Sequence, residues 1–83
     1  MPFSNKYGPL RAHLEKQVGA EYHLTFAQIE KLTGHTLPES SRLRRWWANN
    51  AQNRTQARAW LEAGWRVVKV DFAGRRVRFV RRG

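Results

Sequence analysis

A run of arginines and an asparagine in the middle of the chain has the residue types and spacing of a nucleic-acid contact. Arg42, Arg45 and Asn49 stand at positions i, i+3 and i+7, so on a helix they share one face. Arginine reads guanine, and asparagine reads adenine, by bidentate hydrogen bonds in the DNA major groove. Arg44 lies beside this stripe, where it would contact phosphate. The spacing predicts a helix that contacts DNA bases; contact with phosphate alone, or a solvated face, are the alternatives.

A second group of arginines lies near the C-terminus, on a predicted β-hairpin. With a turn at Ala73-Gly74, Val70 pairs with Val77, and the same register pairs Val68 with Phe79. A soluble edge strand also uses charge to discourage aggregation, but the number of arginines here exceeds that need. Three of them are expected to contact backbone phosphates from the hairpin: Arg75, Arg76 and Arg78.

The net charge of +10 comes entirely from residues 42–83, because residues 1–41 are neutral. The second half holds twelve basic residues, eleven of them arginine, against two acidic ones. A positive field of this size attracts polyanions and releases their counterions on contact. Nucleic acid is therefore the expected partner, with duplex DNA favoured.

Composition and residue spacing argue against several other classes of function. Eighty-three residues make one domain, and the absence of cysteine excludes disulfides and cysteine-based zinc sites. The three histidines show no metal spacing, and no residues assemble into a catalytic set, so we expect neither a cofactor nor an enzyme. No apolar run approaches the roughly 20 residues that cross a membrane. A cytoplasmic protein, associated with the nucleoid if bound to DNA, is the expectation.

Local signals divide the chain into a polar arm (1–8) and one domain (9–83). Pro9 predicts the start of a helix that Gly19 stops. A short strand (21–24) and a helix follow, the latter opened by a capping box at 25–28 and closed by Gly34. Pro38 predicts the start of a third helix, which carries the arginine stripe. A fourth helix is expected from about Thr55 to Glu62, before the hairpin.

The tryptophans are expected to be mainly structural. Neighbouring residues on a helix differ by about 100°, so Trp46 and Trp47 cannot both face inward from the third helix. One is expected in the core and the other at the rim, where it would stack on a base or cover an arginine stem. Trp60 and Trp65 are expected in the core.

The predicted fold is α+β, with a helical N-terminal part followed by the hairpin. Without the fourth helix, this is the order of a winged helix-turn-helix, in which the third helix enters the major groove and the hairpin wing touches the flanking backbone. Arg54 and Arg58 would then grip phosphates beside that helix. Helices three and four equally qualify as the helix-turn-helix pair, which would put Arg54 and Arg58 in the groove.

Several short motifs resemble those of a recurring bacterial family of small proteins or appended domains of unknown function. They are Lys6–Leu10, Leu24-Thr25-Phe26 with Ile29-Glu30, Leu37-Pro38 with Ser40, Trp46–Asn49, Gln56–Trp60 and Ala63–Val67. The resemblance implies a shared fold and brings no established activity. Its polar positions, Glu30, Asn49 and Gln56, are the better functional candidates.

The sequence thus predicts a DNA-binding regulator or accessory factor, and such domains often bind as homodimers. An RNA-binding protein is the first alternative. The second is a protein-interaction module, such as a toxin–antitoxin or phage-encoded factor that docks on an acidic partner. The third is a hydrolase that acts on nucleic acid.

Overall fold

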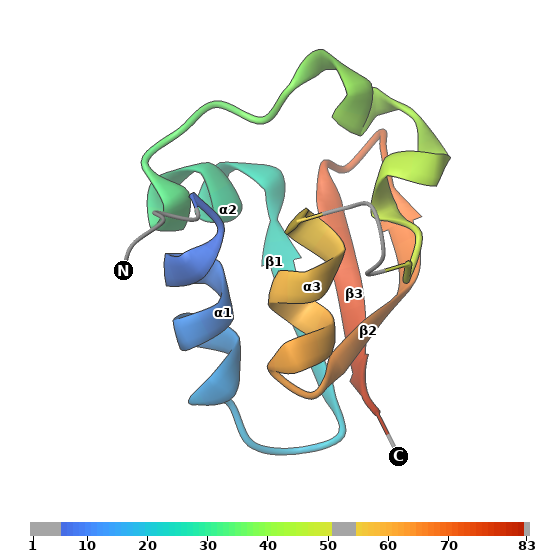
Figure 1. Cartoon of the computed structure of the whole chain (residues 1–83). Coiled ribbons are helices and arrows are strands. Elements are labelled where there is room, and N and C mark those ends of the chain that lie inside the picture. Colours follow the sequence, from blue (N-terminus) through green and yellow to red (C-terminus); the bar gives the residue numbers. More distant parts are fainter. Residues whose placement is uncertain (1–5, 51–54, 83) are drawn as a thin grey trace.

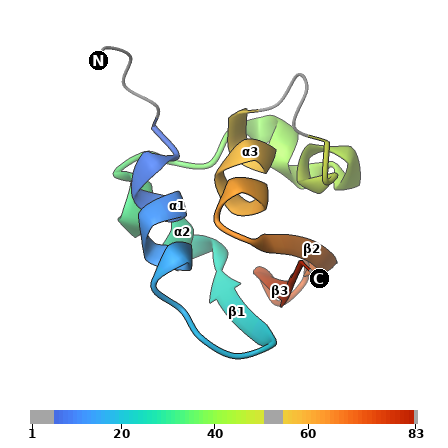
Figure 2. The ribbon, with the colours of Figure 1, turned by 60° about the horizontal axis from the view of Figure 1, so that its bottom comes forward.

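The computed structural model describes residues 6–50 and 55–82, and the elements form two layers (Figures 1 and 2). Helices lie on one side of a three-stranded antiparallel sheet with the strand order β1-β3-β2. The elements are α1 (Gly8–Glu15), β1 (Glu21–Thr25), α2 (Phe26–Thr33), two 3-10 turns η1 (Glu39–Arg42) and η2 (Arg44–Trp47), α3 (Thr55–Glu62), β2 (Trp65–Asp71) and β3 (Arg76–Arg81). The predicted α+β class and C-terminal hairpin are confirmed.

The first helix is shorter than predicted. Pro9 stands in its first turn, where a missing N–H costs nothing. The helix ends well before Gly19, so the predicted stop there is wrong, and Val18 is 88% exposed. The guanidinium of Arg81 on β3 explains the difference, because it donates to the carbonyls of Gln17 (2.8 Å) and Gly19 (3.3 Å). These carbonyls are thereby satisfied outside a helix.

The start of α2 follows the predicted capping box. The Thr25 hydroxyl accepts the Gln28 N–H at 3.0 Å, and the Gln28 side chain accepts the Thr25 N–H at 2.8 Å. Gly34 ends the helix in the left-handed conformation, with a φ of 73°. Since Thr25 is also the last residue of β1, the cap fixes the angle between the first strand and α2.

The predicted third helix is wrong. In its place the chain forms η1 and η2, which are separated by an extended residue, Leu43, and followed by another, Ala48. Arg42, Arg45 and Asn49 therefore do not form a helical stripe.

The burial of two adjacent tryptophans accounts for this departure. Trp46 is 6% exposed and Trp47 is 2% exposed, so the expectation of one tryptophan at the rim is wrong. An α-helix turns neighbouring side chains about 100° apart and would bury only one of them well. Trp47 stacks between Phe26 (ring centroids 5.2 Å apart) and Trp60 (5.9 Å), and Trp46 meets it edge-on at 4.7 Å. Tertiary packing therefore overrides the helical pattern.

The predicted fourth helix and hairpin are confirmed, with one change of register. The helix is α3, and Val70 pairs with Val77 as predicted. Val67, not Val68, pairs with Phe79, because a β-bulge inserts one extra residue between 67 and 69. The bulge keeps Val67 in the core and leaves Val68 at the surface. The turn spans residues 72–75, centred where the sequence predicts it.

We predict that Thr25→Ala lowers the free energy of unfolding by about 1 kcal/mol, because the first turn of α2 loses its side-chain acceptor. Thr25→Ser, which keeps the hydroxyl, is the matched control. Chemical denaturation of the three proteins measures the difference. Equal stability of the alanine and serine variants would show that the cap contributes nothing.

Candidate nucleic-acid interface

All six carboxylates of the chain lie in its described part, and each has a partner. Glu30 accepts the Leu37 N–H at 2.8 Å. The other five form ion pairs with arginine: Glu15 with Arg11, Glu21 with Arg78, Glu39 with Arg42, Glu62 with Arg11 and Arg58, and Asp71 with Arg76. The arginines that no carboxylate contacts therefore mark the surface that carries the excess positive charge.

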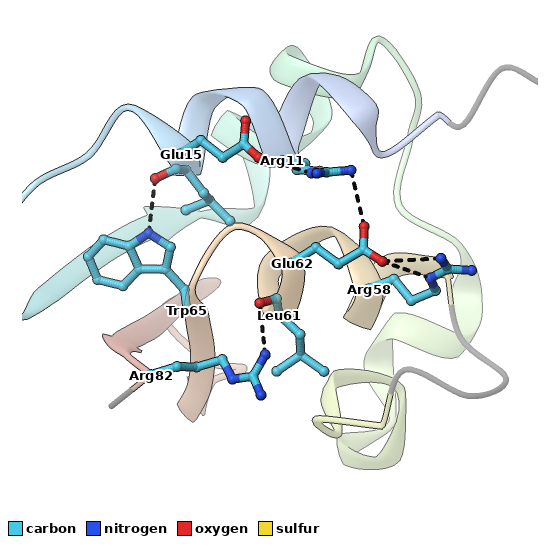
Figure 3. A network of polar contacts seen from close by, with 8 residues as sticks. Arg11, Glu15, Arg58, Leu61, Glu62, Trp65 and Arg82 are labelled. Atoms are coloured by element: carbon cyan, nitrogen blue, oxygen red, sulfur yellow. Dashed lines mark hydrogen bonds and ion pairs between the residues drawn. The ribbon is translucent and has the colours of Figure 1, made fainter. Parts of the chain in front are cut away.

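Arg58 belongs to an ion-pair network that joins α1 to α3 (Figure 3). Its guanidinium contacts Glu62 at 3.1 Å, Glu62 contacts Arg11 at 3.1 Å, and Arg11 contacts Glu15 at 3.0 Å. Between positions 56 and 62 of α3, only the side chains of Arg58 and Glu62 are exposed. The helix thus presents no free row of polar side chains to a ligand.

Arg76 and Arg78 of β3 are also paired, on the face of the sheet opposite the helices. Arg78 contacts Glu21 at 2.9 Å, and His23 on the same strand contacts that carboxylate at 2.6 Å. The hydrogen bonds from His23 and Arg78 hold the pKa of the Glu21 carboxyl below its ordinary value. Arg76 lies 4.0 Å from Asp71, a looser contact across the end of the hairpin.

Arg81 and Arg82, the last two arginines in the sequence, donate hydrogen bonds to backbone carbonyls. Arg82 donates to the Leu61 carbonyl at 3.0 Å, which satisfies an acceptor in the last turn of α3 (Figure 3). Arg81, besides its contacts to the loop before β1, lies 4.0 Å from the ring centroid of Trp65. Both side chains tie the chain ends of the sheet to the helical layer.

Free positive charge remains where η2 and the hairpin meet. The side chains of Arg44, Arg45, Lys69 and Arg75 are exposed and have no ion-pair or hydrogen-bond partner among residues 6–50 and 55–82. Those of Lys16, Lys31 and Arg66 are also exposed without such a partner in this part of the chain, but they lie away from η2 and the hairpin turn. Arg42 joins the first four residues, because its contact with Glu39 is long (3.5 Å) and both side chains are at least 80% exposed. Such a pair contributes little. We call these five residues the basic surface.

The basic surface borders two hollows. One, of about 510 Å³, lies between η2 and β2, with Arg44, Arg45 and Lys69 among its lining residues and no carboxylate. The other, of about 850 Å³, lies between α2, residues 36–42 and the hairpin turn, with Arg42 and Arg75 among its lining residues. Figure 1 shows the segment that carries η1 and η2 passing over the hairpin turn. The arginines of that segment therefore lie near Arg75 of the turn and Lys69 of β2.

Arg75 is held in an unusual backbone conformation. Its φ is +55°, in the left-handed region that favours glycine. The Arg75 carbonyl accepts the Phe26 N–H at 2.8 Å, which docks the hairpin turn on the first residue of α2. The turn is thus fixed to the helical layer, and an arginine occupies a position where glycine would be less strained.

Asn49 is a structural residue, so its predicted contact with a base has no support in its geometry. Its carboxamide oxygen accepts the Val67 N–H (2.9 Å) and the Trp60 indole N–H (3.0 Å). Its amide nitrogen donates to the Val67 carbonyl at 2.9 Å. The side chain thus pairs with the free edge of β2 as a neighbouring strand would, and joins it to α3.

The other polar motif residues also serve the fold. The buried Gln56 side chain donates to the Trp46 carbonyl at 3.0 Å, and Glu30 holds Leu37. These contacts give Gln56 and one carboxylate oxygen of Glu30 a structural role, and their function stays a prediction. Their partners are backbone groups of the irregular segment 37–50, which needs side chains to replace the hydrogen bonds that a helix would supply.

Of the nine predicted contact residues, four belong to the basic surface: Arg42, Arg44, Arg45 and Arg75. Arg54 lies outside the described residues. Lys69 was missed, because the predicted hairpin placed it on the outer face with the paired arginines. The signal that identifies it is spatial: the bulge and the neighbouring η2 turn bring it to the first hollow.

The described part offers neither a metal centre nor a membrane-spanning helix. No group of three or more histidine or acidic side chains there is arranged to hold a metal ion. No helix formed by those residues is both long and apolar enough to pass through a bilayer.

The chain belongs to the family described as Domain of unknown function (DUF7662), which matches residues 7–83. The resemblance seen in the motifs, to a family of unknown function, is thereby confirmed. Neither the curated proteins nor the solved structures contain a match to the chain.

We predict that Asn49→Ala lowers the free energy of unfolding by about 2–3 kcal/mol, because three hydrogen bonds are lost and the buried Trp60 indole N–H is left unpaired. Thr36→Ala, at an exposed residue just before the irregular segment, is the control. Thermal and denaturant unfolding provide the comparison. A loss no greater than that of the control would contradict the structural role of Asn49.

Proposed function

We propose that this protein binds nucleic acid, with duplex DNA as the favoured partner, through contacts between the basic surface and backbone phosphates. One observation carries the proposal. Four of the six carboxylates pair with other arginines, Glu30 accepts the Leu37 N–H and Glu39 is only weakly paired, so the five cations of the basic surface keep their charge exposed. Phosphate groups would neutralise these cations and release condensed counterions.

The order of the elements supports duplex DNA. The order helix, strand, helix, helix and hairpin, with the first strand paired to the last, resembles that of a winged helix domain. In this comparison α2 and α3 would correspond to the helix-turn-helix pair and the β2–β3 turn to the tip of the wing. The segment with η1 and η2 stands between α2 and α3, where that motif has a tight turn. The likeness favours a regulator or accessory factor that contacts DNA with its wing.

Recognition of phosphate, with little reading of bases, is the mode that the geometry favours. The arginine stripe is not helical, and the exposed arginine of α3 is paired with Glu62. A helix with a free polar face is what enters the major groove in helix-turn-helix proteins. Without one, the arginines of η2 and the hairpin turn are suited to the duplex backbone, whose charge is the same for every sequence.

We predict that Arg44→Ala with Arg45→Ala weakens binding to duplex DNA at low salt at least about tenfold and lowers the slope of log K against log salt by about 2, because two phosphate contacts are lost. Lys16→Ala with Lys31→Ala removes the same charge from exposed residues in the first half of the chain and is the matched control. Fluorescence anisotropy with labelled DNA over a salt series measures both quantities.

Equal weakening by the two double variants would show that net charge, and not the basic surface, governs binding. The absence of binding by the wild-type protein at low salt would refute the proposal. A parallel titration with duplex RNA and single-stranded RNA decides the partner: tighter binding to either would replace DNA by RNA.

We predict that Glu39→Gln strengthens binding to duplex DNA about two- to threefold, because the Arg42 guanidinium loses its competing carboxylate and a negative charge leaves the surface. Glu15→Gln makes the same change of net charge on α1. The same anisotropy titration compares them. A gain of the same size from Glu15→Gln would mean that Arg42 makes no special contact.

A further inference from the structure

The hollow beside Arg42 and Arg75 contains the one large aromatic side chain that is substantially exposed among the described residues. Phe72, in the hairpin turn, is 38% exposed and lies edge-on to Phe26, with ring centroids 6.4 Å apart. Phe26 in turn stacks on the buried Trp47. The exposed phenyl ring is therefore supported from behind by the core and cannot fold into it.

The polar groups around this ring are of two kinds. Arg42 and Arg75 supply positive charge at the hollow, and the exposed carboxylate of Glu39, which also lines it, lies 3.5 Å from Arg42. Glu30 lines it too; one of its carboxylate oxygens accepts the Leu37 N–H, and the other has no hydrogen-bond partner among the described residues. An aromatic platform, a hydrogen-bond acceptor and two phosphate-binding cations thus lie within one hollow of about 850 Å³, which is within the size range of small-ligand sites.

From this arrangement we infer that the hollow holds one unpaired nucleobase of a bound DNA. The base would stack on Phe72, an N–H on its edge would donate to Glu30, and the phosphates on either side would contact Arg42 and Arg75. The inference rests on the proposed function and adds a substrate class: duplex DNA interrupted by an unpaired nucleotide. A fully paired duplex offers no free base face, so it would use only the phosphate contacts.

Charge favours a nucleotide over an apolar side chain of a protein partner. An apolar side chain would cover Phe72 but would leave Arg75 without an anion and Arg42 with only its long, exposed contact to Glu39. A nucleotide brings a ring with a flat face and a phosphate in one unit, and arginine and phenylalanine are the side chains that bind these two parts.

Three duplexes of the same sequence test the inference: one fully paired, one with a single-nucleotide bulge, and one with an abasic bulge at the same place. The wild-type protein should bind the base-bearing bulge about tenfold more tightly than the other two. Phe72→Ala should abolish this preference and keep the affinity for the paired duplex, whereas Phe72→Tyr should retain it. Val18→Ala, at an exposed apolar residue of the α1–β1 connection, is the control, and thermal melting verifies that each variant folds.

Each contrary result has its own meaning. Equal wild-type affinity for the three duplexes would overturn the inference and leave the proposed function in place. Equal gains for the base-bearing and abasic bulges would also overturn it, because bending of the bulge and not the base would be recognised. A preference that survives in Phe72→Ala would exclude this hollow. No binding to any duplex at low salt would refute both the inference and the proposed function.

Discussion

The stacking of Trp47 between Phe26 and Trp60 is the contact on which the arrangement of the basic surface depends. The three rings come from α2, η2 and α3, and the stacked pairs are nearly parallel, with interplanar angles of 15° and 14°. The Trp47 indole N–H also donates to the Ser41 carbonyl at 2.8 Å, which ties η2 to η1. A segment with only two short 3-10 turns is thereby held against two helices. Since Arg44 and Arg45 belong to the same turn as Trp47, this stack also sets where their backbone lies.

Two side-chain amides hold the irregular segment in place together with the aromatic stack. Asn49 joins the end of the irregular segment to the edge of β2, and Gln56 joins the start of α3 to the Trp46 carbonyl. A buried backbone group without a partner costs about 1–3 kcal/mol, so a segment without helical hydrogen bonds needs such residues. This need accounts for Asn49 and Gln56, two polar positions of the family motif.

The parts of the fold that the sequence predicts are those with local causes. The capping box at 25–28, α3 and the turn of the hairpin depend on neighbouring residues, and their signals are in the residue types. The path of residues 38–49 depends on the joint burial of Trp46 and Trp47, which a helical pattern cannot express. Likewise, the pairing of Glu21 with Arg78 joins residues far apart in sequence. Sequence reasoning therefore finds which residues are basic, but not which of them the carboxylates neutralise.

This sorting of charge leaves the five exposed cations of the basic surface together on one part of the molecule, which the basic composition alone does not imply. The chain has sixteen basic and six acidic side chains, and folding directs five of the carboxylates to arginines. The carboxylates on α1, on α3 and on the outer face of the sheet reduce the repulsion between arginines there. Around η2 and the hairpin turn, the repulsion between the exposed cations remains. Like charges held close together on a fixed scaffold raise the free energy of the unbound protein, and an anionic ligand relieves that cost on contact. The scaffold here is fixed by the tryptophan stack and by the docking of the Arg75 carbonyl on α2, so little ordering of the backbone would remain to oppose binding.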